Sequence, residues 1–115
     1  MKHSIKTKEL GREKNQRNAL IRSLIESLIK NGKIQTTETR AKVIKPRIEK
    51  MITKAKVPSI FVERSLANVM GKISAHKMIK EIAPKYLERK GGYLRIIKMN
   101  QRLSDGARMA QIEFV

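Results

Sequence analysis

The sequence predicts an α+β fold: a two-layer sandwich in which about four helices cover a small, mixed, three-stranded sheet, with a basic extended tail at the N-terminus. Apolar residues recur every three or four positions between residues 18 and 82, as they do on one face of a helix. Two C-terminal segments, 91–99 and 108–115, are instead rich in residues that favour strands. With 115 residues and no long polar linker, the chain fits one domain plus its tail.

The first helix is predicted over residues 18–30. Its apolar residues form two adjacent rows at four-residue spacing: Leu20, Leu24 and Leu28, and Ile21, Ile25 and Ile29. Asn31 and Gly32 tolerate the left-handed conformation found just past helix ends, so the helix should stop there. Its solvent side is expected to carry an i, i+4 charge ladder of Arg22, Glu26 and Lys30.

A short strand and a long helix are predicted next. The segment 33–37 is β-branched and alternating, and Thr37 is the candidate N-cap of a helix over residues 38–55. Pro46 cannot donate a backbone hydrogen bond, but the apolar stripe keeps its phase across it, which favours one kinked helix over two. That stripe comprises Ala41, Ile44, Ile48, Met51, Ile52 and Ala55.

Two further helices are predicted between residues 59 and 84. Pro58 and Ser59 mark a break and a new cap, and Gly71 is expected to end the third helix. The apolar face of that helix would contain Val62, Leu66, Val69, Met70 and Ile73. Ser74 is expected to cap a fourth helix, closed by Pro84 because the residue before a proline avoids helical geometry. Its shared face comprises Ala75, Met78, Ile79 and Ile82.

The segments 91–99 and 108–115 are predicted strands, joined by the turn-like residues 100–107. They would form a hairpin, or neighbours in one sheet whose third strand is 33–37. Asp105 is the only aspartate in the chain and lies in a Gly-containing turn, so it is interpreted as a turn former rather than a catalyst.

Residues 1–17 are interpreted as an extension of the globular domain, which comprises residues 18–115. The extension has too few large apolar side chains to offset its ordering entropy, so we expect a partner to order it. The whole chain carries 27 Lys and Arg against 10 Asp and Glu, a net charge of +17, which makes nucleic acid the leading partner. The excess is larger in residues 1–56, with 16 basic and 5 acidic side chains, than in residues 57–115, with 11 and 5.

Several classes of protein are disfavoured. The absence of cysteine excludes disulfides, thiolate metal sites and a Cys nucleophile, and the longest apolar runs are far too short to span a membrane. The chain has no phosphate-binding glycine loop, and its two histidines lie in the extension and on a polar helix face, so we predict no catalytic or metal site. Tyr93 alone could stack on a base, but a tyrosine at the start of a strand is more often a core residue.

The sharpest functional feature is one flank of the helix over residues 38–55. At about 100° per residue, Arg40, Arg47 and Lys54 line up beside the apolar stripe, while the pairs Glu38–Lys42 and Lys45–Glu49 occupy the other side. Such a row is ordinarily a solvated face. Joined to the cations of the extension, it favours phosphate contact. The complete set of candidate RNA-binding residues is Lys2, His3, Lys6, Lys8, Arg12, Lys14, Arg17, Arg22, Thr36, Thr37, Arg40, Arg47, Lys54, Arg95 and Arg102.

Several motifs occur in an order and spacing that point to a known family: LGR at 10–12, IQTTETRAK at 34–42, EIAPKY at 81–86 and GGYLRI at 91–96, before a DGARMA ending. On these motifs, and over essentially its whole length, the chain resembles the family of bacterial-type ribosomal protein seventeen of the large (50S) subunit. The resemblance implies an α/β core with a basic N-terminal extension. It also implies a structural protein without catalytic activity, fixed on the solvent side of the ribosome near the mouth of the nascent-chain tunnel.

The partners implied by the resemblance are large-subunit (23S-type) ribosomal RNA and neighbouring ribosomal proteins around the tunnel exit, with no cofactor, membrane or small-molecule substrate. The implied location is the cytoplasm, with an organellar ribosome left open. Two alternatives stay open at this point. A free DNA-compacting or regulatory protein would share the charge and size, although the chain has no pattern of a major-groove reading helix. A small nuclease would need acidic residues gathered around a metal ion.

Overall fold

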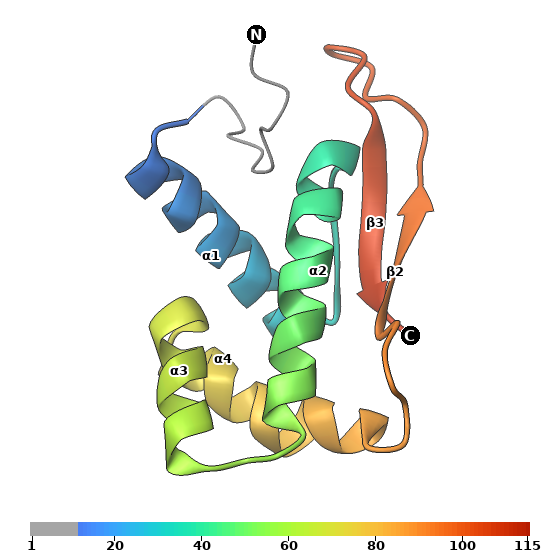
Figure 1. Ribbon diagram of the computed structural model, residues 1–115. Coiled ribbons are helices and arrows are strands. Elements are labelled where there is room, and N and C mark those ends of the chain that lie inside the picture. Colours follow the sequence, from blue (N-terminus) through green and yellow to red (C-terminus); the bar gives the residue numbers. More distant parts are fainter. Residues whose placement is uncertain (1–11) are drawn as a thin grey trace, which may run out of the picture.

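The computed structural model describes residues 12–115 (Figure 1). Lys2, His3, Lys6 and Lys8 of the candidate set therefore lie outside the described residues. The described elements are, in chain order, α1 (Lys14–Asn31), β1 (Lys33–Thr37), α2 (Glu38–Ala55), α3 (Ile60–Met70), α4 (Lys72–Lys77), a π-helical turn (Met78–Ile82), a 3-10 turn (Ala83–Tyr86), β2 (Leu94–Lys98) and β3 (Met109–Phe114).

The three strands form one sheet in the order β1-β3-β2, and α2 lies between that sheet and α1 (Figure 1). The α+β class is thereby confirmed. Both strand pairs are antiparallel, so the expectation of a mixed sheet was wrong. The hairpin makes β2 and β3 antiparallel. The backbone N–H of Glu38 donates to the carbonyl of Arg108, which places the end of β1 at the start of β3 and makes those two strands run in opposite directions as well.

The core lies between the inner face of the sheet and the apolar stripe of α2. Ile44, Ile48 and Ile52 are fully buried, as the stripe predicted. They pack in the same cluster as Ile112 of the central strand, which pairs with Ile34 on one side and Ile96 on the other. α1 adds a second buried face of Ile21, Ile25, Leu28 and Ile29. Alternation along each strand leaves mostly polar side chains on the outer face of the sheet, where Ile97 and Met109 are the apolar exceptions.

The first helix begins at Lys14, four residues before the expected start at Asn18. The backbone N–H of Arg17 donates to the carbonyl of Glu13, so the first turn forms without any apolar side chain. The apolar rows that predicted the helix begin only at Leu20, which explains the difference. The predicted end was correct, because Gly32 adopts a φ of 82° and its N–H caps the carbonyl of Leu28.

The expected strand and helix around Thr37 are confirmed. β1 spans Lys33–Thr37, and the hydroxyl of Thr37 accepts the backbone N–H of Arg40 at 3.3 Å, as an N-cap should. α2 continues through Pro46 as one helix, as predicted, while the kink expected there stays a prediction.

The third and fourth helices differ more from expectation. Ser59 caps α3 and Gly71 ends it as predicted, but Val69 and Ile73 are 42% and 88% exposed, so their assignment to the buried face was wrong. α3 is apolar on most sides, and its contacts with α4, α1 and α2 decide which side is buried. α4 begins directly after Gly71 rather than at Ser74, because the left-handed φ of 85° at the glycine already breaks α3.

Pro84 does not close the fourth helix. The helical chain runs from α4 through a π-helical turn into a 3-10 turn that ends at Tyr86. The N–H of Ala83 donates five residues back, to the carbonyl of Met78, and Pro84 then lies at the start of the 3-10 turn, where no N–H donor is required. A local change of helix type therefore accommodates a residue that would stop a regular α-helix.

Tyr93 is a core residue, as expected for a tyrosine at the start of a strand. Its side chain is fully buried, with the ring 5.2 Å from that of Tyr86. Its hydroxyl donates to the carbonyl of Arg89 and lies 3.3 Å from the hydroxyl of Thr53. These contacts attach the segment before β2 to α2, so Tyr93 is not available to stack on a base.

Candidate nucleic-acid interface

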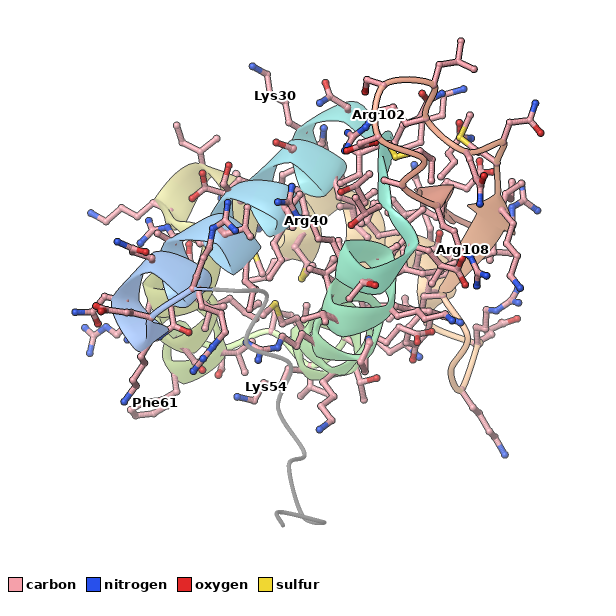
Figure 2. The ribbon with its side chains drawn as sticks, turned by 90° about the horizontal axis from the view of Figure 1, so that it is seen from above. Lys30, Arg40, Lys54, Phe61, Arg102 and Arg108 are labelled. Atoms are coloured by element: carbon pink, nitrogen blue, oxygen red, sulfur yellow. The ribbon has the colours of Figure 1, made fainter. Side chains whose placement is uncertain are left out.

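The flank of α2 with Arg40, Arg47 and Lys54 carries cations that no carboxylate neutralises within residues 12–115. Lys54 Nζ donates to the hydroxyl of Ser65 on α3, at 3.2 Å. Figure 2 shows Arg40 and Lys54 on the side of α2 away from the strands. The flank therefore faces α1 and α3, and its charge is free to meet an external anion.

A hollow of about 430 Å³ opens beside this flank, where α1, α2 and α3 meet. It brings together Arg22 of α1 and Arg47 of α2, with Asn18 and Asn68 beside them. Arg22 also pairs with Glu26 at 2.9 Å, but both side chains are about half exposed, so water screens this pair strongly. Two guanidinium groups that converge from different helices are suited to phosphate oxygens, and the asparagine amides can bind sugar or base edges.

The sequence predicted two ion pairs on the opposite flank of α2, and only one of them forms. Glu38 and Lys42 form the predicted pair at 2.9 Å, whereas Lys45 and Glu49 form no ion pair, so that expectation was wrong. One carboxylate oxygen of Glu49 is buried without a hydrogen-bond partner, and Lys preceding Glu is the weaker order for an i, i+4 pair. Lys30 likewise does not join the ladder with Arg22 and Glu26.

Sequence reasoning did not identify two further cations, Lys98 and Arg108, near the start of α2. The hydrogen bond from Lys42 lowers the pKa of Glu38, and the charges of Lys98 and Arg108 lower it further. Lys98 ends β2 and Arg108 precedes β3, and their positions beside α2 follow from the direction of the hairpin. No sequence pattern specified that direction.

Thr36 and Thr37 have structural roles in addition to any RNA contact. Thr36 is 7% exposed and lies opposite Ala110 in the sheet, while the hydroxyl of Thr37 caps α2. Their assignment to RNA binding stays a prediction. Three candidate RNA-binding residues lie just before α1 or in its first turn: Arg12 and Lys14 are exposed, and Arg17 is half-buried.

Arg95 and Arg102 lie apart from the α2 flank. Arg95 pairs with Glu113 at 3.3 Å across the outer face of the sheet. Arg102 is at the tip of the β2–β3 hairpin, where its Nε and one terminal nitrogen bind the two carboxylate oxygens of Asp105 at 2.9 and 2.7 Å. Asp105 also accepts the N–H of Ala107, which confirms that it forms the turn. These arginines are partly neutralised within the protein.

The Arg102–Asp105 pair gives a prediction for the pH dependence of the hairpin tip. The hydrogen bonds from Arg102 and from the N–H of Ala107 lower the pKa of Asp105 to about 2. Because this pKa lies below the ordinary value of 3.8, the pair stabilises the tip above that pH, and the contribution is lost as the pH falls through about 2. In Arg102→Gln, the pKa should rise toward 3.8 in an NMR titration of the carboxyl carbon. An equal pKa in both proteins would contradict the pairing.

Residues 12–115 contain no group of three or more His, Cys, Asp or Glu side chains that could hold a metal ion. In the same part of the chain, no helix is both long and apolar enough to cross a membrane. The hollow beside α2 is therefore a cationic surface without any metal-binding cluster among the described side chains.

A family model described as "Ribosomal protein L17" matches residues 20–115. The chain belongs to the ribosomal protein L17 family. It is 44% identical over 117 aligned residues to the large ribosomal subunit protein bL17 of Neorickettsia sennetsu, with all of both chains covered. The proteins of the same name from a Sulfurihydrogenibium species and from Clostridium botulinum are 45% and 46% identical, covering 100% and 94% of this chain and 97% and 96% of theirs.

Membership of the L17 family confirms the resemblance found in the motifs. It also confirms that the chain is a ribosomal protein rather than an enzyme, which decides against the nuclease. A free DNA-compacting or regulatory protein loses its support for the same reason.

Proposed function

We propose that the protein is a structural constituent of the large ribosomal subunit that binds large-subunit ribosomal RNA through its basic N-terminal extension and the Arg40–Arg47–Lys54 flank of α2. It acts near the exit of the nascent-chain tunnel, where it contributes to subunit assembly and contacts neighbouring ribosomal proteins. The proposed site of action is the ribosome of the cytoplasm, or of an organelle. In the proposed organisation, residues 1–17 are the RNA-binding extension and residues 18–115 the globular body.

The observation that carries this proposal is the convergence of Arg22 and Arg47 in one hollow beside α2. Arg22 shares its charge with Glu26 in an exposed pair, whereas Arg40, Arg47 and Lys54 form no ion pair with a carboxylate within residues 12–115. Guanidinium groups fork onto phosphate oxygens, and several of them along one surface bind a polyanion in a salt-dependent manner. The names of the relatives, each a protein of the large ribosomal subunit, support RNA of that subunit as the polyanion.

The absence of cysteine allows a direct test, because one introduced cysteine is a unique attachment point. Asn68→Cys, at the rim of the hollow, would carry an iron chelate that cleaves nearby RNA in assembled large subunits. We expect the protein to co-sediment with large subunits at high salt, and the cleavages to cluster in RNA around the tunnel exit. The cysteine-free protein, treated identically, is the control. Recovery outside ribosomes, or no cleavage from residue 68, would overturn the proposal.

A further inference from the structure

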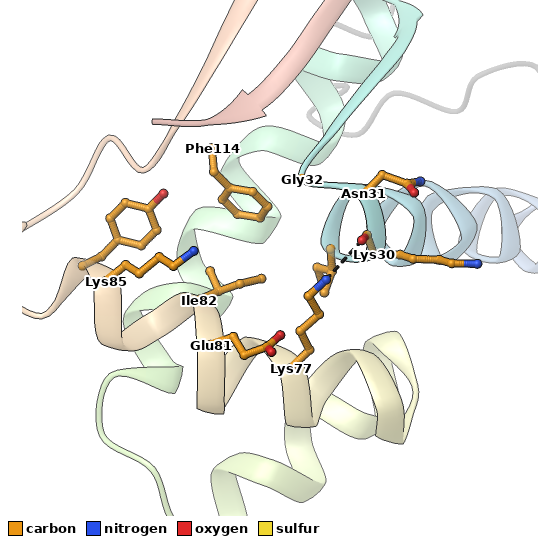
Figure 3. A pocket seen from close by; sticks show the side chains of 10 residues that line it. Lys30, Asn31, Gly32, Lys77, Glu81, Ile82, Lys85 and Phe114 are labelled. Atoms are coloured by element: carbon orange, nitrogen blue, oxygen red, sulfur yellow. Dashed lines mark hydrogen bonds between the residues drawn. The ribbon is translucent and has the colours of Figure 1, made fainter.

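A second cavity, of about 620 Å³, lies at the other end of α1 from the Arg22–Arg47 hollow. It is formed by the C-terminal end of α1, the π-helical turn and the end of β3 (Figure 3). Residue 22 and residue 31 are nine positions apart on α1, which is about 13 Å along a helix at about 1.5 Å per residue. The two cavities are therefore separate sites on one rigid element.

The lining of this cavity combines apolar side chains with charged groups. Ile29, Ile82 and the ring of Phe114 form the apolar part. Lys77 and Lys85 extend toward the cavity in Figure 3, with the carboxylate of Glu81 between them and Phe114 above. Lys30 also lines the cavity, but its side chain points away from it in Figure 3, so two ammonium groups, those of Lys77 and Lys85, face one carboxylate. The cavity therefore carries a net positive charge and attracts anions.

The polar groups of the cavity are only partly used within the protein. Lys77 Nζ donates to the backbone carbonyl of Lys30 at 3.1 Å, which fixes its position over the end of α1. Neither Lys85 nor Glu81 has an ion-pair partner among residues 12–115. A ligand can therefore meet the ammonium group of Lys77, which a hydrogen bond holds in place, and the ammonium group of Lys85, which has no ion-pair partner among the described residues. It can also donate hydrogen bonds to the carboxylate of Glu81.

We propose that this cavity binds one unpaired nucleotide of RNA, with its base against Phe114 and its phosphate between Lys77 and Lys85. An aromatic ring beside cations is how proteins hold unstacked bases, and a carboxylate can accept the amino hydrogens of a base edge. The volume is in the usual range for a small-ligand site of about 300–1,000 Å³. An apolar protein side chain would fill the floor but would leave the ammonium groups of Lys77 and Lys85 without an anion.

This inference rests on the proposed function in one respect, namely that the ligand is RNA. It adds a second RNA site to the body of the protein, chemically different from the first. The α2 flank presents arginines to phosphates, whereas the cavity would select a base that has left its stack. The protein would then hold two RNA segments at opposite ends of α1.

The test uses the full chain, labelled with ¹⁵N, and two probes: a single strand of ten adenosines and a ten-base-pair RNA duplex. We expect the single strand to shift the amide signals of Gly32, Lys77 and Phe114, and the duplex to shift those of Arg47 and Asn68 without them. Lys77→Gln with Lys85→Gln should weaken binding of the single strand by roughly tenfold, because it removes both cations that would bond the phosphate. Lys80→Gln with Lys90→Gln removes the same charge outside the cavity and should change it less than threefold.

Phe114→Leu tests the stacking separately. It keeps most of the apolar volume and removes the ring, so binding of ten adenosines should fall by at least about fivefold, because the base loses its stacking partner. Thermal unfolding shows whether this variant is folded. If RNA shifts only the Arg47 and Asn68 signals, the nucleotide site is wrong while the proposed function stands. If neither RNA binds, the proposed function is wrong, and the nucleotide site is wrong with it. Shifts of the amide signals of Gly32 and of residue 114 that survive in both variants would also overturn the site.

Discussion

Reversing the charge of Arg40 and Arg47 together is expected to reduce the affinity for large-subunit ribosomal RNA by at least a hundredfold. Neither guanidinium has a carboxylate partner among the described residues, so each is available to bond a phosphate oxygen. Two charge-assisted hydrogen bonds of about 1.5–3 kcal/mol each account for that loss. Arg47→Glu also places a carboxylate beside Arg22 in the hollow. That carboxylate would pair with the guanidinium of Arg22 and compete with phosphate for it.

The measurement is the binding constant as a function of salt concentration. Each lost phosphate contact lowers the slope of log K against log salt by about one, so the slope should decrease by about two. Lys42→Glu with Lys45→Glu changes the charge equally, on the opposite flank of α2, and should weaken binding much less. An equal loss in the two double variants would mean that only the net charge matters, and not the position of the arginines.

The periodicity of the sequence was sufficient to predict most elements, because the apolar stripes of α1 and α2 are confined to one face of each helix and that face is the buried one. Ile44, Ile48 and Ile52 face the sheet just as their spacing indicates. α3 shows where this reasoning stops. Ile60, Phe61 and Val69 belong to a helix that is apolar on most sides, and all three are exposed. Spacing cannot choose the buried side of such a helix, because that choice depends on how α4, α1 and α2 pack against it.

The candidate sites were less predictable than the elements, because they combine segments that are far apart in the chain. Arg40, Arg47 and Lys54 share one helix, so helical geometry alone placed them on one flank. Arg22 joins Arg47 only because α1 packs beside α2. The nucleotide cavity combines residues 29–32, 77–86 and 114, and each of its lysines on its own resembles a solvated surface charge.

Deletion of residues 2–11 is expected to leave the body folded and to weaken RNA binding by at least tenfold. α1 begins at Lys14, and no described element includes a deleted residue. The midpoint of thermal unfolding should therefore change by less than about 2 °C, whereas a loss of about 1 kcal/mol in stability would lower it by about 4–8 °C in a domain of this size. The deletion removes Lys2, Lys6 and Lys8 together with His3. Loss of three phosphate contacts would lower the salt slope by up to about three.

Two full-length variants separate charge from sequence in this extension. Replacing Lys2, Lys6 and Lys8 by glutamine keeps the length and should reproduce most of the deletion's effect. Shuffling residues 2–11 keeps every charge, and should retain the affinity if phosphate neutralisation alone is the source of binding, because that interaction does not depend on residue order. A shuffled extension that binds as poorly as the deletion would instead require side chains at fixed positions. Affinity unchanged by the deletion would remove the extension from the RNA interface and leave binding to the arginines of α2.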